Sequence, residues 1–147
     1  MNLSQENADE YSPKEDTYFL LDLIEPLKGE RVLEIGCSKG FLLDHFSTGR
    51  EGLYVGIDIS LKSLTTGKPS KLEFVKADGE FLPFRNDCFD LIFFNPPYLP
   101  SDSIEDKTVD GGKEGIEVTI KFLKTSKKAL KSSGLVTFIT SSLSNLD

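Results

Sequence analysis

The segment Asn95-Pro96-Pro97-Tyr98 has the residue types needed to hold a planar amine or amide group. It follows an apolar run, and its two prolines restrict the backbone that carries the asparagine. The side-chain oxygen of Asn95 and the carbonyl oxygen of Pro96 can both accept hydrogen bonds from one NH2 group, while Tyr98 offers a flat face for stacking. Such a site directs a nitrogen lone pair at an electrophile by positioning and electrostatics rather than through a strong base. We therefore predict that these four residues position the reacting nitrogen of a substrate.

A glycine-rich turn lies earlier in the chain, in Leu33-Glu34-Ile35-Gly36-Cys37-Ser38-Lys39-Gly40. Such a turn between a strand and a helix lets the backbone approach a polar or anionic ligand closely. The dinucleotide pattern Gly-x-Gly-x-x-Gly fails, because Ser38 and Phe41 stand at its second and third glycine positions. The hydrolase pattern Gly-x-Ser-x-Gly matches, but that fold needs a late histidine, and the one histidine, His45, lies seven residues after Ser38. We expect His45 on a helix surface or in packing. The turn also resembles that of S-adenosylmethionine-dependent methyltransferases, in which an acid two residues before the first glycine, here Glu34, helps to hold the cofactor's amino-acid end. The alternative is a tight turn that binds no ligand.

Two further acidic residues follow the next two apolar runs. Asp58 comes 22 residues after Gly36, where an acid is placed to accept hydrogen bonds from both ribose hydroxyls. Asp58 could instead cap a following helix, but Ser60 could serve as that cap and leave Asp58 free. Asp78 can accept a hydrogen bond from the amine of an adenine, and the amide of Gly79 can reach a ring nitrogen. With the acid of the glycine turn, these residues predict a nucleoside site at the switch point of a parallel sheet.

Alternating apolar runs and amphipathic stretches predict the elements that position these residues. Strands are expected at Arg31–Ile35, Leu53–Ile57, Leu72–Val75, Leu91–Phe94 and Leu135–Ile139. Helices are expected at Thr17–Leu27, Phe41–Phe46 and Glu114–Lys131, with one long loop at Ser101–Gly115. This order predicts an α/β fold with a doubly wound, mostly parallel sheet.

Composition sets the broad class of protein. The length of 147 residues predicts a single domain over 1–147, with a polar tail over 1–10. The net charge of −7 argues against direct binding of a nucleic-acid backbone, which requires many cations. No apolar run approaches the ~20 residues of a membrane helix, and the polar start does not resemble a secretory signal. Cys37 and Cys88 lack metal-ligand spacing, so no metal site is expected. We predict a cytoplasmic enzyme or binding domain.

Together with Tyr11-x-Pro13-x-Glu15-Asp16-Thr17, these motifs resemble the class I, Rossmann-like methyltransferases of the HemK-like group. More narrowly, the chain is similar to the archaeal and eukaryotic branch that methylates the glutamine of the Gly-Gly-Gln loop in translation termination factors. The segment Asp110-Gly111-Gly112-Lys113-Glu114-Gly115 adds to this likeness, which extends from Tyr11 to about Ile139. Ser38 departs from the glycine usual in the family, and the family's sixth and seventh strands are not expected in this sequence.

The resemblance implies a function, a cofactor and partners. It implies transfer of a methyl group from S-adenosyl-L-methionine to a glutamine amide of a termination factor, aided by a small zinc-binding activator subunit. Asn95, Pro96, Pro97 and Tyr98 would contact the target amide. Residues expected at the cofactor are Thr17, Glu34, Gly36, Cys37, Ser38, Gly40, Asp58, Asp78, Gly79 and Asn95. The alternatives are an adenine-amino methyltransferase acting on DNA or RNA, and a non-catalytic subunit that retains the fold.

Overall fold

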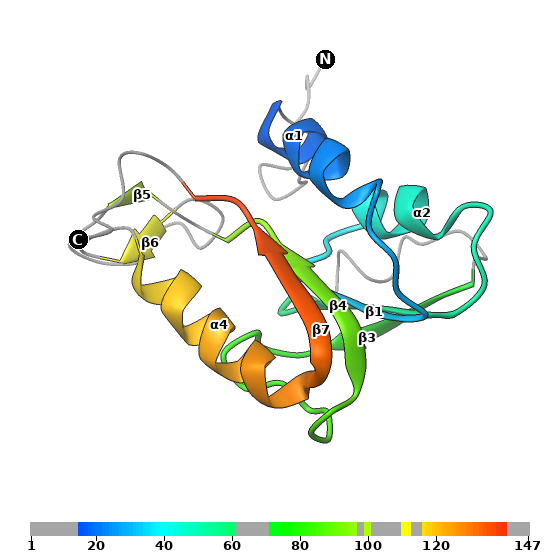
Figure 1. Ribbon diagram of the computed structural model, residues 1–147. Helices are drawn as coiled ribbons and strands as arrows, with labels where there is room; N and C mark the ends of the chain where they lie inside the picture. The colour runs from blue at the N-terminus through cyan, green and yellow to red at the C-terminus, as the bar shows by residue number, and fades with distance from the viewer. Residues whose placement is uncertain (1–14, 61–70, 97–98, 101–109, 113–115, 141–147) are drawn as a thin grey trace, which may run out of the picture.

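The computed structural model describes residues 15–60, 71–96, 99–100, 110–112 and 116–140 (Figure 1). The expected tail over 1–10, the motif residues Tyr11, Pro13, Pro97 and Tyr98, and most of the predicted loop lie outside these ranges. The described elements are α1 (Glu15–Ile24), β1 (Arg31–Ile35), α2 (Phe41–Ser47), β2 (Leu53–Asp58), β3 (Leu72–Lys76), β4 (Phe89–Phe94), β5 (Leu99–Pro100), β6 (Asp110–Gly112), α4 (Glu117–Ala129) and β7 (Leu130–Phe138).

The central sheet has five strands in the order β3-β2-β1-β4-β7, and every neighbouring pair is parallel. The chain therefore builds outward from β1 to β3 on one side and then from β4 to β7 on the other. This reversal places a switch point between β1 and β4, where open α/β sheets bind ligands beyond the carboxyl ends of their strands. The predicted doubly wound parallel sheet is confirmed.

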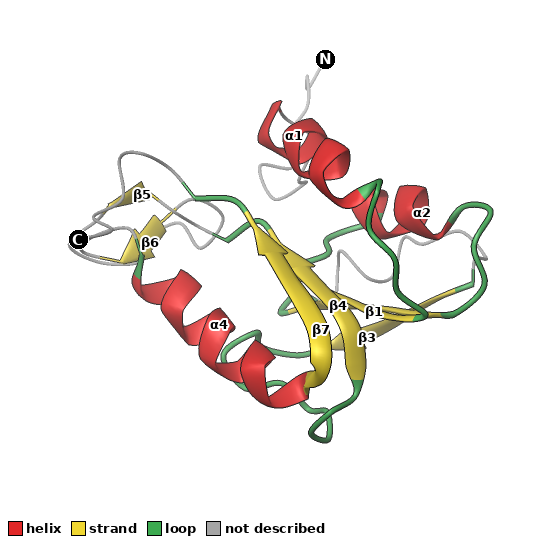
Figure 2. Cartoon of the chain, viewed as in Figure 1, coloured by secondary structure: helices red, strands yellow, loops and turns green. Residues whose placement is uncertain are grey.

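Helices cover both faces of the sheet, with α1 and α2 on one side and α4 on the other (Figures 1 and 2). The first face packs Leu20 and Ile24 of α1 and Phe46 of α2 against alternate strand residues such as Val32 and Phe93. The opposite face packs α4 against the other alternate set, which includes Leu33, Ile35, Val55, Ile57, Ile92 and Phe94. Strands buried on both faces explain why their sequences are apolar nearly throughout.

Helix boundaries differ from the expected ones for local reasons. Helix α1 ends at Ile24 rather than Leu27, because Pro26 disfavours helical geometry at the residue before it. Helix α4 begins at Glu117 rather than Glu114, since Ile116 has the non-helical backbone of a cap, with φ −127°. Residues 113–115 lie outside the described ranges.

Strands β2, β3 and β4 differ from the expected bounds by one or two residues, and larger corrections concern β7 and the predicted loop. β7 begins at Leu130 rather than Leu135, because Leu130 already pairs with Phe89 while the polar residues that follow it form an irregularity in the ladder. The predicted loop Ser101–Gly115 contains the short strand β6, which pairs with β5 in a separate two-stranded sheet. The alternation of apolar and polar residues that predicts a strand is absent at Pro100 and at Asp110-Gly111-Gly112.

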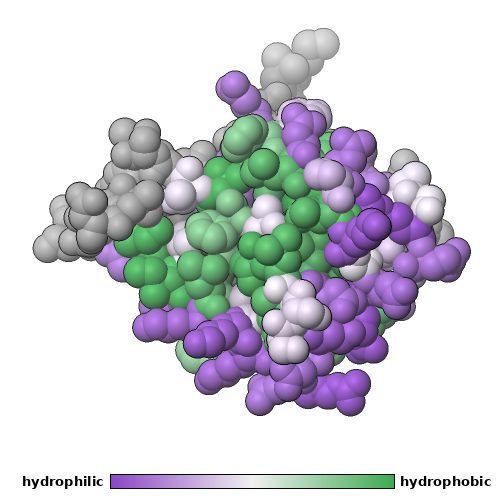
Figure 3. Space-filling view, in the orientation of Figure 1, coloured by the Kyte–Doolittle hydropathy of each residue, from purple (hydrophilic) through white to green (hydrophobic). Residues whose placement is uncertain are grey.

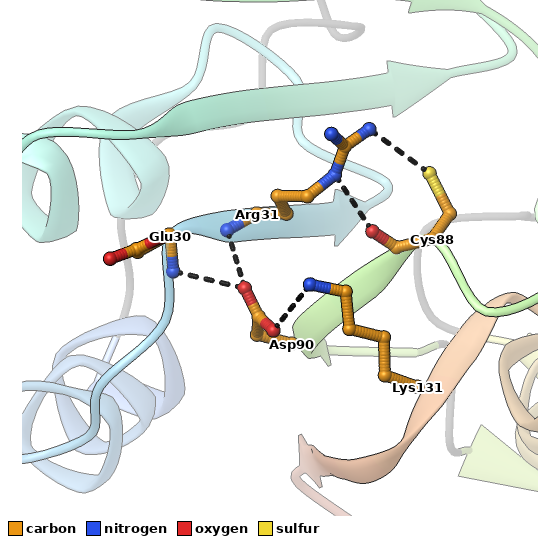
Figure 4. A network of polar contacts seen from close by, with 5 residues as sticks. All are labelled: Glu30, Arg31, Cys88, Asp90 and Lys131. Carbon is orange, nitrogen blue, oxygen red and sulfur yellow. Dashed lines mark hydrogen bonds and ion pairs between the residues drawn. The ribbon is translucent and has the colours of Figure 1, made fainter.

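A polar network ties β1, β4 and β7 together at their amino ends (Figure 4). Asp90 accepts hydrogen bonds from the backbone amides of Glu30 and Arg31 and from Nζ of Lys131. Nε of Arg31 donates to the carbonyl oxygen of Cys88 at 2.9 Å. Burial acts to raise the pKa of Asp90, but the hydrogen bond and charge of Lys131 and the two amides outweigh it and hold the pKa below its usual value. This network links β1, β4 and β7 at the edge of the sheet opposite the switch-point end.

Strand β7 pairs with one neighbour, β4, and so forms an edge of the described sheet. Figure 3 shows a broad apolar area on the face where this edge lies. Leu135 of β7 is 48% exposed, and Tyr18 and Phe19 of α1 are 53% and 58% exposed. Within the described residues, no helix has both the length and the apolar character needed to cross a bilayer.

Candidate active site

The polar residues singled out from the sequence meet at one edge of the sheet. Glu34 is the second-last residue of β1, Asp58 is the last residue of β2, and Asn95 directly follows β4. The register aligns Ile35 with both Ile57 and Phe94, so the three strands end side by side. Glu34, Asp58 and Asn95 therefore lie at the carboxyl edge of the sheet, beside the switch point between β1 and β4.

The turn between β1 and α2 has a backbone that favours glycine at two positions. Gly36 has φ 74° and Gly40 has φ 82°. A side chain at Gly40 would meet the ring of Phe74 at 2.9 Å, whereas a side chain at Gly36 would meet no atom within 4 Å. Gly36 is therefore constrained by its backbone conformation, and its α-carbon faces open space beside the end of β1.

Ser38 also has a left-handed backbone conformation, with φ 49°. It stands at the position where the family that the sequence resembles usually has glycine. A left-handed conformation costs an L-residue about 1 kcal/mol. The amide of Ser38 donates to Oδ2 of Asp58 at 2.9 Å, a charge-assisted hydrogen bond that offsets this strain. The departure from glycine is thus accommodated within the turn.

Asp58 links the glycine turn to the segment after β2. Its Oδ2 accepts the Ser38 amide, and its Oδ1 accepts the amide of Ser60 at 2.9 Å. Asp58 therefore holds the backbone of Ser60, and the segment that either residue could cap lies outside the described residues. Within the described residues, these two amides occupy two of about four acceptor positions of the carboxylate.

Glu34 is a buried acid, 5% exposed, and its Oε2 has no hydrogen-bond partner within the described residues. Burial raises the pKa of Glu34 well above its usual value, the nearby charge of Asp58 adds to this, and the backbone amide of Leu43 acts in the opposite direction. A buried carboxylate with one oxygen unpaired is unfavourable, and a cationic ligand would relieve that cost.

Cys37 lies behind the turn. Its amide donates to the carbonyl oxygen of Ile57, its carbonyl oxygen accepts the amide of Gly40, and its side chain packs against Gly56. Burial, with the charges of Glu34 and Asp58, raises the pKa of its thiol. Cys37 therefore shapes the turn and presents no reactive thiolate.

Asn95 is oriented by Asp16, a residue that the sequence motifs contain but that we did not expect at the site. Nδ2 of Asn95 donates to Oδ2 of Asp16 at 2.9 Å, across 79 residues of sequence. A carboxylate only accepts, so this contact makes Nδ2 the atom that faces Asp16. Oδ1 of Asn95 is buried and has no partner within the described residues. The adjacent Thr17, expected at the cofactor, is fully buried and its amide donates to Oδ1 of Asp16.

The segment after β3 forms a tight turn. Oδ1 of Asp78 accepts the amide of Glu80 at 2.9 Å, and the carbonyl oxygen of Asp78 accepts the amide of Phe81. Asp78 is exposed and Gly79 is buried. One carboxylate oxygen of Asp78 is thus held by its own turn, which orients the other.

His45 does not form a catalytic pair with Ser38. Its Nδ1 contacts the carbonyl oxygen of Phe41 at 3.0 Å, and its ring packs 4.4 Å from the Phe41 ring. Its exposed position on α2 confirms the prediction of a helix-surface residue.

Comparison with known proteins identifies the family to which the chain belongs. The methyltransferase domain family matches residues 32–108. A Methanocaldococcus jannaschii protein provisionally named a protein N5-glutamine methyltransferase is 33% identical over 143 residues, covering 90% of this chain and 73% of that protein. The human methyltransferase HEMK2 is 28% identical over 154 residues, covering 90% of this chain and 72% of its own length.

Among solved structures, the E. cuniculi Mtq2–Trm112 complex is described as responsible for methylation of the eRF1 translation termination factor. The matched chain is 31% identical with a TM-score of 0.64, and the match covers 78% of this chain and 66% of that one. The present chain therefore spans slightly less than two thirds of that solved chain.

The parallel sheet, the glycine turn and the polar residues at the switch point define a class I methyltransferase fold. The chain belongs to the methyltransferase domain family, whose cofactor is S-adenosylmethionine. Within that family it is similar to a protein named as a protein N5-glutamine methyltransferase and to one described as methylating the eRF1 translation termination factor.

Proposed function

We propose that this chain transfers a methyl group from S-adenosylmethionine to the amide nitrogen of a glutamine in a translation termination factor. The observation that carries the proposal is the state of Asn95. Its NH2 group is held by Asp16, and its buried Oδ1 lacks a partner within the described residues. An unpaired buried acceptor is costly, and a substrate NH2 group is a donor that would satisfy it.

The residues at the other strand ends fit the cofactor. The partnerless carboxylate oxygen of Glu34 suits the positively charged amino-acid end, and the open space at Gly36 lets a ligand approach the backbone. Asp58 would accept hydrogen bonds from the ribose, and Asp78 from the adenine amine. Ser38, Gly40 and Cys37 would then act by shaping the turn that holds these groups.

Bound S-adenosylmethionine supplies an electrophilic methyl carbon on a sulfonium. Asn95 would accept one hydrogen bond from the substrate NH2, which places electron density on its nitrogen and fixes the direction of its lone pair. The bound sulfonium would supply the methyl group and keep the electron pair of the carbon–sulfur bond, while the substrate nitrogen would lose one N–H proton to solvent. Pro96 would supply the second acceptor from its carbonyl oxygen, and Tyr98 a stacking surface.

The similar proteins favour a protein substrate over a nucleic acid. The E. cuniculi complex is described as methylating eRF1, and it contains a second subunit, Trm112. The net charge of −7, with an acidic segment around Asp102, Glu105, Asp106 and Asp110, would also repel a nucleic-acid backbone. A small zinc-binding activator and a cytoplasmic location, where translation ends, complete the proposal.

The test is transfer of a tritiated methyl group to a recombinant termination factor, with and without the activator subunit. Wild-type factor should be labelled, and a factor whose Gly-Gly-Gln glutamine is replaced by alanine should not. DNA and RNA oligonucleotides that contain adenine form the other arm. Labelling of an oligonucleotide in preference to the factor would overturn the proposed substrate and favour the adenine-amino alternative. If the chain binds the cofactor but methylates neither the termination factor nor an oligonucleotide, the non-catalytic alternative is favoured.

A further inference from the structure

Helix α4 holds the turn at Asp78 and Gly79 from the face opposite the glycine turn. Oγ1 of Thr125 donates to the carbonyl oxygen of Gly79 at 2.8 Å, a shorter contact than the 3.1 Å to the carbonyl of Phe122 in its own helix. The Phe122 ring packs so closely that a side chain at position 79 would lie 2.7 Å from it. Helix α4 therefore fixes Gly79 through both a hydrogen bond and a packing contact.

One peptide unit connects Thr125 to the carboxylate of Asp78. The carbonyl oxygen of this unit, from Gly79, accepts the Thr125 hydroxyl. Its N–H, from Glu80, donates to Oδ1 of Asp78 at 2.9 Å. Because a peptide unit is planar, fixing its carbonyl also fixes the direction of its N–H. Thr125 thereby sets the orientation of a carboxylate that it does not touch.

The same helix also reaches the strand that ends in Asn95. The ring of Phe122 makes an edge contact with Phe94, with the centroids 5.5 Å apart. Phe94 is the last residue of β4 and directly precedes Asn95. Helix α4 thus joins the Asp78 turn to the base of the proposed transfer site through neighbouring residues.

We propose that Thr125 is a positioning residue that aims Asp78 at the adenine amine and so sets selectivity for the adenine base. This inference rests on the proposed function, because it assigns the adenine end of the cofactor to Asp78. It predicts a specific effect on base recognition rather than a general loss of binding.

The experiment compares two ligands by calorimetry with the full chain. S-adenosylhomocysteine carries the adenine amine, and S-inosylhomocysteine carries a carbonyl oxygen in its place. The wild type should prefer the amine by about tenfold, the scale of one charge-assisted hydrogen bond. Thr125→Val and Thr125→Ala, which both lack the donor, should bind S-adenosylhomocysteine about three- to tenfold more weakly and lose most of this preference. Thr125→Ser keeps a hydroxyl and should restore it.

Thr119→Val is the matched control. Thr119 is a buried threonine of the same helix whose hydroxyl has no partner within the described residues, so its removal should leave the base preference unchanged. Equal weakening of both ligands in Thr125→Val and Thr125→Ala would overturn the inference, and so would an unchanged preference. Failure of the wild type to bind S-adenosylhomocysteine would instead contradict the proposed function.

Discussion

The hydrogen bond between Asp16 and Asn95 leads to a quantitative prediction about turnover. Asp16→Ala removes the group that holds the NH2 of Asn95, so its amide can rotate and present a donor to the substrate. A hydrogen bond to a charged group contributes about 1.5–3 kcal/mol, and each 1.4 kcal/mol corresponds to about a factor of ten. We expect kcat to fall by about ten- to a hundredfold, because the oriented acceptor is no longer the dominant state.

A double-mutant cycle separates this effect from an independent role of Asp16. Asn95→Ala should lower kcat by about a hundredfold or more, the scale for loss of a preorganised group. If Asp16 acts through Asn95, the double variant should be no slower than Asn95→Ala alone. If the fold-losses of kcat in the two single variants multiply in the double variant, the reasoning is refuted.

The assay is methyl transfer at saturating cofactor and termination factor. Loss of Asp16 also removes an acid from the first turn of α1, which costs about 0.3–1 kcal/mol of stability. Rates should therefore be compared well below the melting temperature of each variant. Asp22→Ala is the matched control, since Asp22 is an exposed acid on the same helix, and it should leave kcat unchanged.

Three further outcomes are expected. Asp58→Ala should weaken S-adenosylmethionine binding by the loss of one or two charge-assisted hydrogen bonds, about 1.5–3 kcal/mol each, and an unchanged dissociation constant in calorimetry would rule out the ribose role. The raised pKa of Glu34 means that the folded state favours the protonated carboxyl. Its contribution to the free energy of unfolding is therefore complete below the usual pKa of 4.5 and is lost as pH rises through the raised pKa. Glu34→Gln should therefore flatten the fall of thermal stability with pH while weakening cofactor binding; equal pH profiles for both proteins would contradict this. The 147-residue polypeptide should self-associate through β7, and Leu135→Lys should reduce this in sedimentation, whereas a wild-type monomer at all concentrations would disprove it.

The strand pattern was predictable because burial on both faces selects long apolar runs. Arg31–Ile35 has the expected boundaries, and the other main strands differ at their ends. β7 extends further because Leu130 finds a partner in Phe89, a contact that depends on how the chain returns to the sheet. Pairing of this kind is a tertiary event and leaves no local periodicity.

The placement of Glu34, Asp58 and Asn95 at the carboxyl edge of the sheet was predictable from the apolar runs that contain or precede them. The candidate site was not predictable where a role depends on a contact across the fold. Asp16 of α1 contacts Asn95, which follows β4, and Thr125 of α4 contacts Gly79, 46 residues earlier in the chain. Sequence spacing carries no signal for either contact, so orientation of the site had to come from the structure.

The network around Asp90 lies apart from the candidate site, so contacts that stabilise the sheet and groups proposed for binding and transfer occupy opposite edges. Groups proposed for binding and transfer lie at the carboxyl edge of the sheet, where a buried acid and a left-handed serine are tolerated despite their cost. The contacts of Arg31, Asp90 and Lys131 lie at the amino edge and face no ligand in the proposed reaction (Figure 4). Thermostabilising changes confined to that amino edge would add stability without the loss of activity that accompanies changes near a strained site. For protein engineering, the molecule therefore offers one edge that can be optimised for stability and another whose unfavourable features should be retained.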